Sequence, residues 1–299
     1  MGSFPSFIKQ VQSIWLVEAS PALKEMQQHT LCPDGNINGN QGVSFAGVPV
    51  HWVQAQDQIP NGDPSFLITN EFFDALPTHT FKFQEGKWAE VMVDVAGASD
   101  KDQDFRFVLA PRRTAATAFF EKQVAMHIPK DGEVLEFSFD VSREMESIAR
   151  RIRANQGSAL IFDYGEDCPV GGSLRGIRQH AKYSPLRDPG LADLSVDVNF
   201  NQLRTIAEKE GLRCAGPINQ GTFLTEMGIS SRLERLLHSV GDSHETRQQL
   251  SSECERLIHP DQMGTKYKVL CASFANETAQ PVPVAFESTA TTESLDRRV

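Results

Sequence analysis

An amide and two carboxylates follow directly on a short apolar run in this sequence. Asn70, Glu71 and Asp74 come after residues 66–69, a segment of the type that forms strands. We interpret the segment as an interior strand of a mostly parallel sheet, and in such sheets ligands bind outside the carboxyl ends of the strands. The three side chains are therefore candidates for the rim of an active site. The alternative is that Glu71 and Asp74 only cap or charge the first turn of a short helix.

Two further acids stand at the ends of apolar runs. Glu18 follows residues 14–17, and Asp163 with Tyr164 follows residues 159–162. The two oxygens of one carboxylate can accept both hydroxyls of a ribose, which makes Glu18 a candidate for holding a nucleoside cofactor. A charge at a helix N-terminus is the other reading of Glu18, because Ser20 and Pro21 predict an N-cap and a first helical residue.

The remaining pattern alternates strands and helices. Strands are expected at 50–53, 80–83, 88–93, 105–109, 212–215 and 267–272, with a hairpin connection at 84–87; helices are expected at 21–28, 115–124, 142–153 (ended by Gly157) and 200–210, with two or three more between 222 and 257. Residues 166–199 read as irregular. This order predicts an α/β protein with a doubly wound sheet around a small-molecule site, a single domain over residues 1–275 and a disordered tail from 276 to 299.

Composition excludes several classes of protein. The 299 residues are 40% hydrophobic, enough for a sizeable core, and 29 basic against 39 acidic residues give a net charge of −10. That balance argues against broad electrostatic binding to nucleic acid or to an anionic membrane. The five cysteines lack metal-ligand spacing, so we expect reduced thiols and no metal site, and no apolar run is long enough to span a bilayer.

Six runs together resemble the MidA family of S-adenosylmethionine-dependent methyltransferases, whose mitochondrial members are protein arginine methyltransferases needed for the assembly of respiratory complex I. The runs are Leu-Val-Glu-Ala-Ser at 16–20, Thr-Asn-Glu-Phe-Phe-Asp-Ala-Leu-Pro at 69–77, Phe-Arg-Phe-Val-Leu-Ala-Pro at 105–111, Ala-Leu-Ile-Phe-Asp-Tyr-Gly at 159–165, the segment 188–200 and Gly-Thr-Phe-Leu at 221–224. The resemblance extends in order over about residues 13–274.

The resemblance implies a fold, a reaction and a set of site residues. It implies a Rossmann-like methyltransferase sheet with an inserted α/β portion and a C-terminal helical segment, the cofactor S-adenosylmethionine, symmetric dimethylation of an arginine in a complex I core subunit, and residence in the mitochondrial matrix. Carried over by position, the family assigns Glu18 to the cofactor ribose and Asn70, Glu71 and Asp74 to the substrate side of the site. Asp163 and Tyr164 would line the same entrance to the site. Asp193 and Asp197 would offer further acidic contacts. For His79, Arg175 and His180 we expect a solvated surface role.

The chemistry of the acids agrees with an arginine substrate. A guanidinium is cationic at any relevant pH, and carboxylates can grip it through paired hydrogen bonds while directing one terminal nitrogen. Methyl transfer needs in-line approach more than acid or base strength, so positioning should supply most of the rate.

One departure from the family stands out. Its members carry a glycine-rich loop, E-x-G-x-G-x-G, after the central strand of the sheet, and this sequence has none; only Met1 to Gln12 precede the run at 14–17. The absent strand would contribute on the order of 10 kcal/mol of burial. We therefore expect an incomplete chain that binds the cofactor weakly and leaves unpaired strand edges at 14–17 and 66–69. The absence of a mitochondrial presequence fits the same expectation.

Two other functions stay open. A non-catalytic assembly or scaffold protein derived from the family would keep the acidic mouth to bind a basic segment of a partner. A nicotinamide-dependent dehydrogenase would need a dinucleotide-binding glycine fingerprint, which the sequence lacks.

Overall fold

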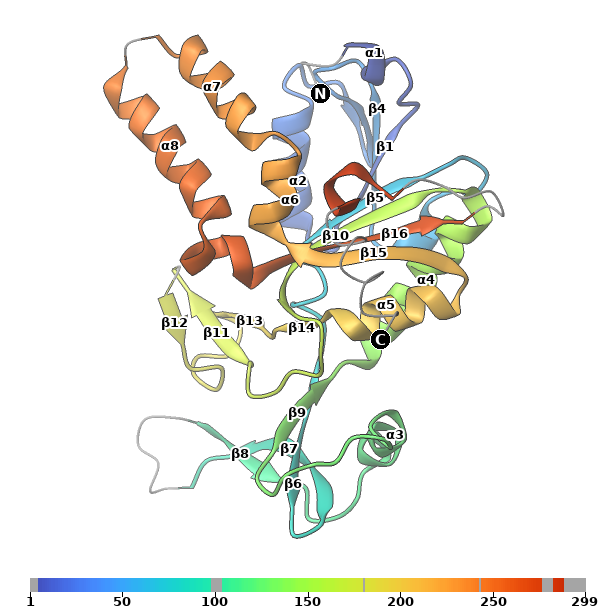
Figure 1. Ribbon diagram of the computed structural model, residues 1–299, viewed down its shortest axis with the longest axis vertical. Helices are drawn as coiled ribbons and strands as arrows, with labels where there is room; N and C mark the ends of the chain where they lie inside the picture. The colour runs from blue at the N-terminus through green and yellow to red at the C-terminus, as the bar shows by residue number, and fades with distance from the viewer. Residues whose placement is uncertain (1–4, 98–103, 180, 242, 276–281, 288–299) are drawn as a thin grey trace, which may run out of the picture. The chain divides into compact units, whose positions relative to one another are not determined.

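The computed structural model describes residues 5–97, 104–179, 181–241, 243–275 and 282–287 (Figure 1). The chain divides into two compact units, Met1–Asp63 and Pro64–Val299, and each is described by itself. Among the described residues, no helix combines the length and apolarity that crossing a membrane requires.

The first unit is a small sheet with one long helix. Its elements are α1 (Pro5–Ile8), β1 (Ile14–Val17), α2 (Pro21–Leu31), β2 (Ile37–Asn38), β3 (Gln41–Val43), β4 (Pro49–Val53) and the 3-10 turn η1 (Gln56–Gln58). The strand order is β1-β4-β3-β2, and only the β1–β4 pair is parallel. Ser20 caps α2, as expected, because its side chain accepts a hydrogen bond from the amide of Leu23. Cys32, Val50 and Trp52 form the buried core of this unit.

The main sheet of the second unit is built around β10. Its strands are β5 (Phe66–Asn70), β10 (Ser158–Glu166), β14 (Val198–Asn199), β15 (Leu212–Asn219) and β16 (Tyr267–Phe274). Strand β10 runs parallel to β5 and β14 and antiparallel to β16, which in turn pairs with β15.

Alternation along β10 separates two cores. Ala159 and Ile161 belong to the core that contains residues of α4 (Phe139–Asn155) and α5 (Phe200–Lys209). Leu160 and Phe162 pack instead against a second cluster with Phe223 of α6 (Gln220–Glu226). The sheet is therefore covered on both faces at β10, as the centre of a doubly wound fold requires.

Two smaller sheets are inserted into this unit. The inserted sheet contains β6 (His79–Gln84), β7 (Lys87–Val95), β8 (Phe105–Leu109) and β9 (Val134–Phe137) in the order β8-β7-β6-β9, with α3 (Ala115–Gln123). Phe81, Trp88, Phe120 and Leu135 form its core. The second sheet contains β11 (Arg175–Arg178), β12 (Ala181–Tyr183) and β13 (Asp193–Ser195) in the order β12-β11-β13.

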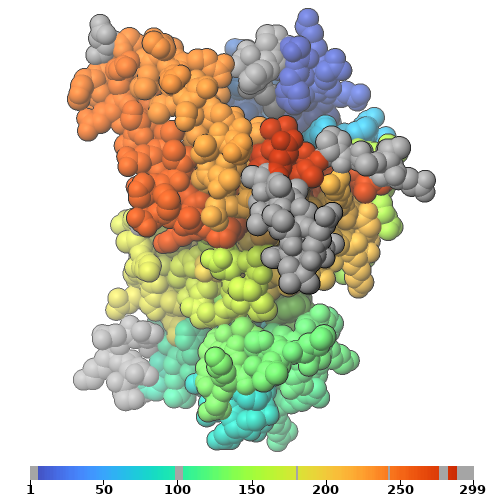
Figure 2. All heavy atoms as spheres, viewed as in Figure 1, coloured from blue at the N-terminus to red at the C-terminus, as the bar shows by residue number. Residues whose placement is uncertain are grey.

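The C-terminal part is helical before its last strand. After α6 come α7 (Ile229–Ser239), α8 (His244–Ile258) and the π-helical turn η2 (Pro260–Gly264), and the 3-10 turn η3 (Val284–Phe286) follows β16. Helices α7 and α8 form the orange surface in Figure 2. All five cysteines of the chain are free.

The structure confirms the hairpin at 84–87 and the helices at 21–28, 115–124 and 200–210. The interpretation of residues 66–69 as an interior strand is wrong. Phe66 and Ile68 of β5 are 81% and 71% exposed, and β10 is the one strand that pairs with β5 among the described residues. The sheet is also mixed rather than mostly parallel, because β10–β16 and β15–β16 are antiparallel. As expected, β1 and β5 each pair along one edge only within the described ranges.

Other boundaries differ for local reasons. Helix α4 begins at Phe139 because Ser138 caps it, and Gln156 rather than Gly157 takes the left-handed conformation after it. Gly157 instead allows close approach of the backbone of Ser65, since a Cβ at position 157 would lie 2.0 Å from the carbonyl oxygen of Ser65. Residues 166–199, expected to be irregular, contain the strands β11 to β14. Of the tail expected to be disordered, residues 282–287 are described and bury Ala285 and Phe286; 276–281 and 288–299 lie outside the described residues.

Candidate active site

Asp163 fixes the loop that follows β5 onto strand β10. One carboxylate oxygen of this wholly buried residue accepts hydrogen bonds from the amides of Phe73 at 3.1 Å and Asp74 at 3.4 Å, and the other accepts one from the amide of Tyr164 at 3.0 Å. The amide of Glu71 also bonds to β10, at the carbonyl oxygen of Phe162, 3.0 Å away. Asp163 therefore positions the loop. Its place at a strand end had suggested instead that it lines an open mouth.

Asp74 lies against the phenol of Tyr164. The Tyr164 hydroxyl donates a hydrogen bond to Oδ2 of Asp74 and also contacts the hydroxyl of Ser195. Asp74 is only 7% exposed, and its Oδ1 is buried with no hydrogen-bond partner among the described residues. A buried carboxylate oxygen without a donor is costly, so Oδ1 is a natural acceptor for an N–H group of a ligand.

Gly165 allows the backbone of Val198 to approach the end of β10. A Cβ at position 165 would lie 2.0 Å from the carbonyl oxygen of Val198, which belongs to the strand paired with this end of β10. The amide of Val196 additionally donates to the carbonyl oxygen of Asp74 at 3.1 Å. The end of β13 is thereby held against the acid.

Glu71 reaches the same cluster through a second tyrosine. Its backbone is left-handed, with φ of 48°, which costs a non-glycine residue about 1–3 kcal/mol. The hydroxyl of Tyr267 donates to Oε1 of Glu71 at 2.9 Å, and the rings of Tyr267 and Tyr164 meet edge to face with centroids 5.4 Å apart. The two carboxylates of Glu71 and Asp74 are thus linked through a pair of tyrosines.

Arg175 closes the cluster on another side. Its guanidinium carbon lies 4.5 Å from the centroid of the Tyr164 ring, and its Nη1 donates to Oδ1 of Asp197 at 2.7 Å. This geometry combines a cation–π contact with an ion pair. Tyr164 can therefore carry a guanidinium on its face while its hydroxyl holds Asp74.

The charges of these groups depend on burial. Burial is the main reason why the pKa of Asp163 is raised to about 8. The charge of Asp74 also raises this pKa, whereas the hydrogen bonds from three backbone amides lower it. Burial also raises the pKa of Asp74, and the nearby charge of Glu71 raises it too. The hydrogen bonds with Tyr164 and Ser195 and the charge of Arg175 lower it. The pKa of Tyr164 is raised by burial and by its bond to Asp74. Asp74 and Asp163 together therefore hold a proton near neutral pH.

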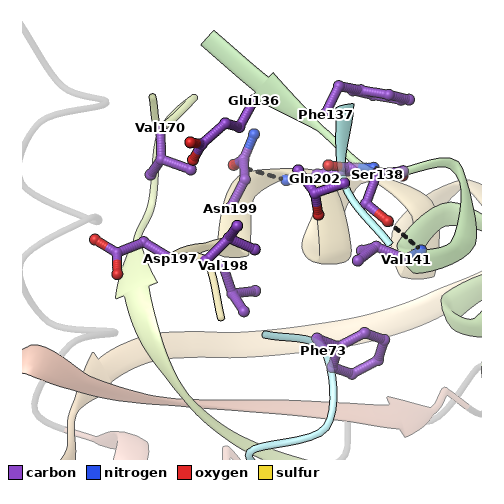
Figure 3. A pocket seen from close by; sticks show the side chains of 12 residues that line it. Phe73, Glu136, Phe137, Ser138, Val141, Val170, Asp197, Val198, Asn199 and Gln202 are labelled. Carbon is purple, nitrogen blue, oxygen red and sulfur yellow. Dashed lines mark hydrogen bonds between the residues drawn. The ribbon is translucent and has the colours of Figure 1, made fainter. Parts of the chain in front are cut away.

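A small cavity lies beside the cluster, between β9 and the start of α5. Glu136, Ser138, Asp197, Val198 and Gln202 are among its lining residues, which Figure 3 shows coming from different elements. Its volume of about 20 Å³ holds a single water molecule. The cavity is far too small for a cofactor or a peptide.

Comparison with known proteins gives the family. Residues 1–218 match the family described as "Putative S-adenosyl-L-methionine-dependent methyltransferase". The chain belongs to this methyltransferase family. It is 35% identical over 272 residues to the mitochondrial protein arginine methyltransferase NDUFAF7 homolog of Drosophila melanogaster, covering 86% of this chain and 60% of the relative. It is 36% identical over 264 residues to the mitochondrial protein arginine methyltransferase NDUFAF7 of Homo sapiens, covering 85% of this chain and 57% of that protein. The chain thus spans about 60% of the length of the curated relatives it matches.

Solved structures agree on the fold of this chain. A Burkholderia thailandensis protein crystallised with S-adenosyl-homocysteine superposes with a TM-score of 0.75 at 21% identity, over 96% of this chain and 69% of that one. A second Burkholderia thailandensis structure, of a native protein, gives a TM-score of 0.74 over 92% of this chain and 69% of that one. The predicted Rossmann-like methyltransferase fold is confirmed.

The candidate cofactor residue, Glu18, lies directly after β1, at the carboxyl end of the parallel β1–β4 pair. Its half-buried carboxylate accepts hydrogen bonds from the amide of Ser20 at 2.8 Å and from Nε2 of Gln27 at 3.1 Å. Each oxygen keeps a lone pair for a further donor, so the residue fits a ribose diol. The role of Glu18 stays a prediction.

The other candidate residues separate into two groups. Asn70 ends β5 and Asp197 pairs with Arg175, so both lie near the cluster, whereas Asp193 is exposed on β13 and His79 bonds to Glu90 in the inserted sheet at 2.6 Å. His180 lies outside the described residues. Sequence reasoning missed Ser195 and Tyr267 and set Arg175 aside. Ser195 stood between two acids in a run that the resemblance had singled out, but Tyr267 gave no comparable signal.

Proposed function

We propose that this chain belongs to an S-adenosylmethionine-dependent protein arginine methyltransferase. The observation that carries the proposal is the buried Oδ1 of Asp74, which has no partner among the described residues. It is held in place by the Tyr164 hydroxyl on the other oxygen of the same carboxylate. A guanidinium N–H would satisfy it with a charge-assisted hydrogen bond.

The rest of the cluster suits a guanidinium better than an ammonium. Glu71 offers a second carboxylate, anchored by Tyr267, so that two acids can accept from two edges of a planar fork. The ring of Tyr164 already carries the guanidinium of Arg175, which supports the idea that aromatic faces here accept such groups. A compact ammonium would use neither the fork nor the flat face as well.

The acids also provide for the proton that the reaction releases. When bound, S-adenosylmethionine would supply an electrophilic methyl group. A guanidinium that received this methyl group would have to lose one proton from the methylated nitrogen, because the methylated guanidinium carries the same single positive charge as before. We assign the acceptance of that proton to Asp74, because burial raises its pKa and makes it a better acceptor than an ordinary carboxylate. Glu18 is the residue we assign to the cofactor ribose.

The sequence relatives support a finer assignment. Their names describe mitochondrial protein arginine methyltransferases. We extend this to the present protein: residence in the mitochondrial matrix, an arginine of a respiratory complex I core subunit as the target, symmetric dimethylation as the modification, and support of complex I assembly as the result.

The test is a methylation assay with the protein, S-adenosylmethionine labelled in the methyl group, and matched peptides containing arginine or lysine. We expect label in the arginine peptide only, with symmetric dimethylarginine found by mass spectrometry. Binding of the arginine peptide without transfer, in the presence of cofactor binding measured by calorimetry, would favour the non-catalytic assembly protein. Transfer to lysine would contradict the proposed substrate class.

A further inference from the structure

Glu136 is a buried acidic residue on β9, outside the acids discussed above. It is 6% exposed, and its Oε1 accepts hydrogen bonds from the amides of Ser173 at 2.9 Å and Leu174 at 3.2 Å. The hydroxyl of Ser173 donates to the other oxygen, Oε2. Three donors from two consecutive residues therefore meet one carboxylate, which fixes the loop just before β11 onto the inserted sheet.

Ser173 passes this constraint on to Arg175 and Asp197. The hydroxyl oxygen of Ser173 accepts a hydrogen bond from the amide of Asp197 at 2.8 Å, and its carbonyl oxygen accepts one from Nη1 of Arg175 at 3.1 Å. The same Nη1 bonds to Asp197 at 2.7 Å. Glu136 thus fixes Ser173, and Ser173 contacts both partners in this ion pair, in addition to the pairing of Arg175 with Ser195 between β11 and β13. Figure 3 shows Glu136 and Asp197 lining one cavity from different elements.

Arg175 in turn acts on the acid of the site. Its guanidinium lies over the ring of Tyr164, whose hydroxyl donates to Asp74. The positive charge of Arg175 lowers the pKa of Asp74, against burial and the charge of Glu71. The charged and titratable groups that act on Asp74 are thus Glu71 from the loop, Asp163 and Tyr164 from β10, and Arg175 from β11.

We propose that Glu136 is a positioning residue for the site: through Ser173 it holds Arg175 over Tyr164 and thereby tunes the charge state of Asp74. The inserted sheet is in this way connected, through Ser173, Arg175 and Tyr164, to Asp74, the acid that we assign to the substrate. The effect on catalysis rests on the proposed function, whereas the effect on the position of Arg175 does not.

Nuclear magnetic resonance of the protein tests the position directly. A proton held over an aromatic face is shifted upfield, so the side-chain Nε–H signal of Arg175, assigned with Arg175→Lys, should lie upfield of those of exposed arginines. Glu136→Gln and Ser173→Ala should both move it to the ordinary position, and Ser173→Thr, which keeps the hydroxyl, should retain the upfield shift. The indole signal of Trp88 reports whether the inserted sheet remains folded.

An Arg175 signal that stays upfield in both Glu136→Gln and Ser173→Ala would overturn the proposal. If the protein methylates arginine, a second readout follows: the acidic limb of the rate against pH should move to higher pH in Ser173→Ala, because Arg175 lowers the pKa of Asp74, and should stay in place in Ser173→Thr. An unmoved limb in Ser173→Ala would contradict the link to Asp74. If the unaltered protein transfers no methyl group, the proposed function fails while the resonance experiment still decides the position of Arg175.

Discussion

The hydroxyl of Tyr164 donates a hydrogen bond to Oδ2 of Asp74, across 90 residues of sequence. This bond occupies one oxygen of the carboxylate and leaves Oδ1 buried without a partner among the described residues. The loop that carries Asp74 is fixed to the same strand, since Asp163 accepts hydrogen bonds from its amides. A single strand, β10, therefore sets both the place and the charge of the acid that we assign to the substrate.

In a full-length protein, replacing Asp74 with asparagine should abolish arginine methylation while leaving cofactor affinity nearly unchanged. Loss of a charged hydrogen bond costs roughly 1.5–3 kcal/mol, about 10- to 150-fold in kcat/KM, and misorientation of the nucleophile adds to it. Rates with an arginine peptide and calorimetry with the cofactor check the two halves of the prediction. Asp131→Asn, at an exposed acid of the inserted sheet whose oxygen still accepts the hydrogen bond from the amide of Glu85, is the matched control. Unchanged turnover in Asp74→Asn would remove this residue from the mechanism.

Replacing Tyr164 with phenylalanine should shift the pH dependence of activity. The Tyr164 hydrogen bond lowers the pKa of Asp74, so its loss raises that pKa, and Asp74 then becomes ionised only at higher pH. The acidic limb of kcat/KM should move upwards. Tyr183→Phe, which removes a hydroxyl bonded to the exposed Asp188, should leave it in place. Superimposable profiles for Tyr164→Phe and the unaltered enzyme would refute the role of this bond.

The buried Asp163 should make folding stability fall with rising pH. Its pKa of about 8 in the folded protein lies above the ordinary 3.8, so the folded state holds the proton over a range in which the unfolded chain has lost it. The stabilisation present below the lower value is therefore lost as pH rises through the higher one, by at most about 1.4 kcal/mol per pH unit. Chemical denaturation between about pH 5 and pH 8 measures this slope.

Asp163→Asn, which cannot titrate, is expected to be less stable overall because the amide nitrogen faces a backbone N–H, but to lack this component of the slope. Asp131→Asn again provides the exposed control. Equal slopes in the Asp163→Asn variant and the unaltered protein would show that Asp163 is ionised when folded.

Alanine at position 165 should destabilise the second unit. Its Cβ would lie 2.0 Å from the carbonyl oxygen of Val198, so β14 would have to move away, at a cost of roughly 2–4 kcal/mol. Gly190→Ala is the control, because Gly190 has φ of 85° but open space around it, and only backbone strain of about 1 kcal/mol is expected there. Thermal or denaturant unfolding compares the two. Similar losses in both variants would mean that close approach is unimportant at 165.

Hydrogen exchange should distinguish β5 from β10. Strand β10 has partners on both sides, whereas β5 pairs on one side among the described residues, so alternate amides of β5 have no strand acceptor there. Amides of residues 66–69 should exchange faster than those of 159–162, and residues 14–17 of β1 should behave like β5. Uniform strong protection of all three segments would show that other residues cover these edges. Mass spectrometry of peptic fragments is sufficient for the measurement.

Local signals in the sequence determined much of the secondary structure. Ser20 before Pro21 gave the start of α2, and Glu85 with Gly86, both with positive φ, gave the two-residue turn between β6 and β7. These features depend on interactions within a few residues, which a single sequence displays directly. The same holds for the position of Asn70, Glu71 and Asp74 after a strand, and the six-run resemblance added the methyltransferase fold.

Only the tertiary structure decided which of these side chains meet. Asp163 looked like a residue of the mouth, but the continuation of β10 to Glu166 buries it beneath the loop and turns it into an anchor for the amides of Phe73 and Asp74. Tyr267, Ser195 and Arg175 join the site from three other strands. Register between distant strands sets such encounters, and register depends on packing across the whole sheet rather than on the residues beside each side chain.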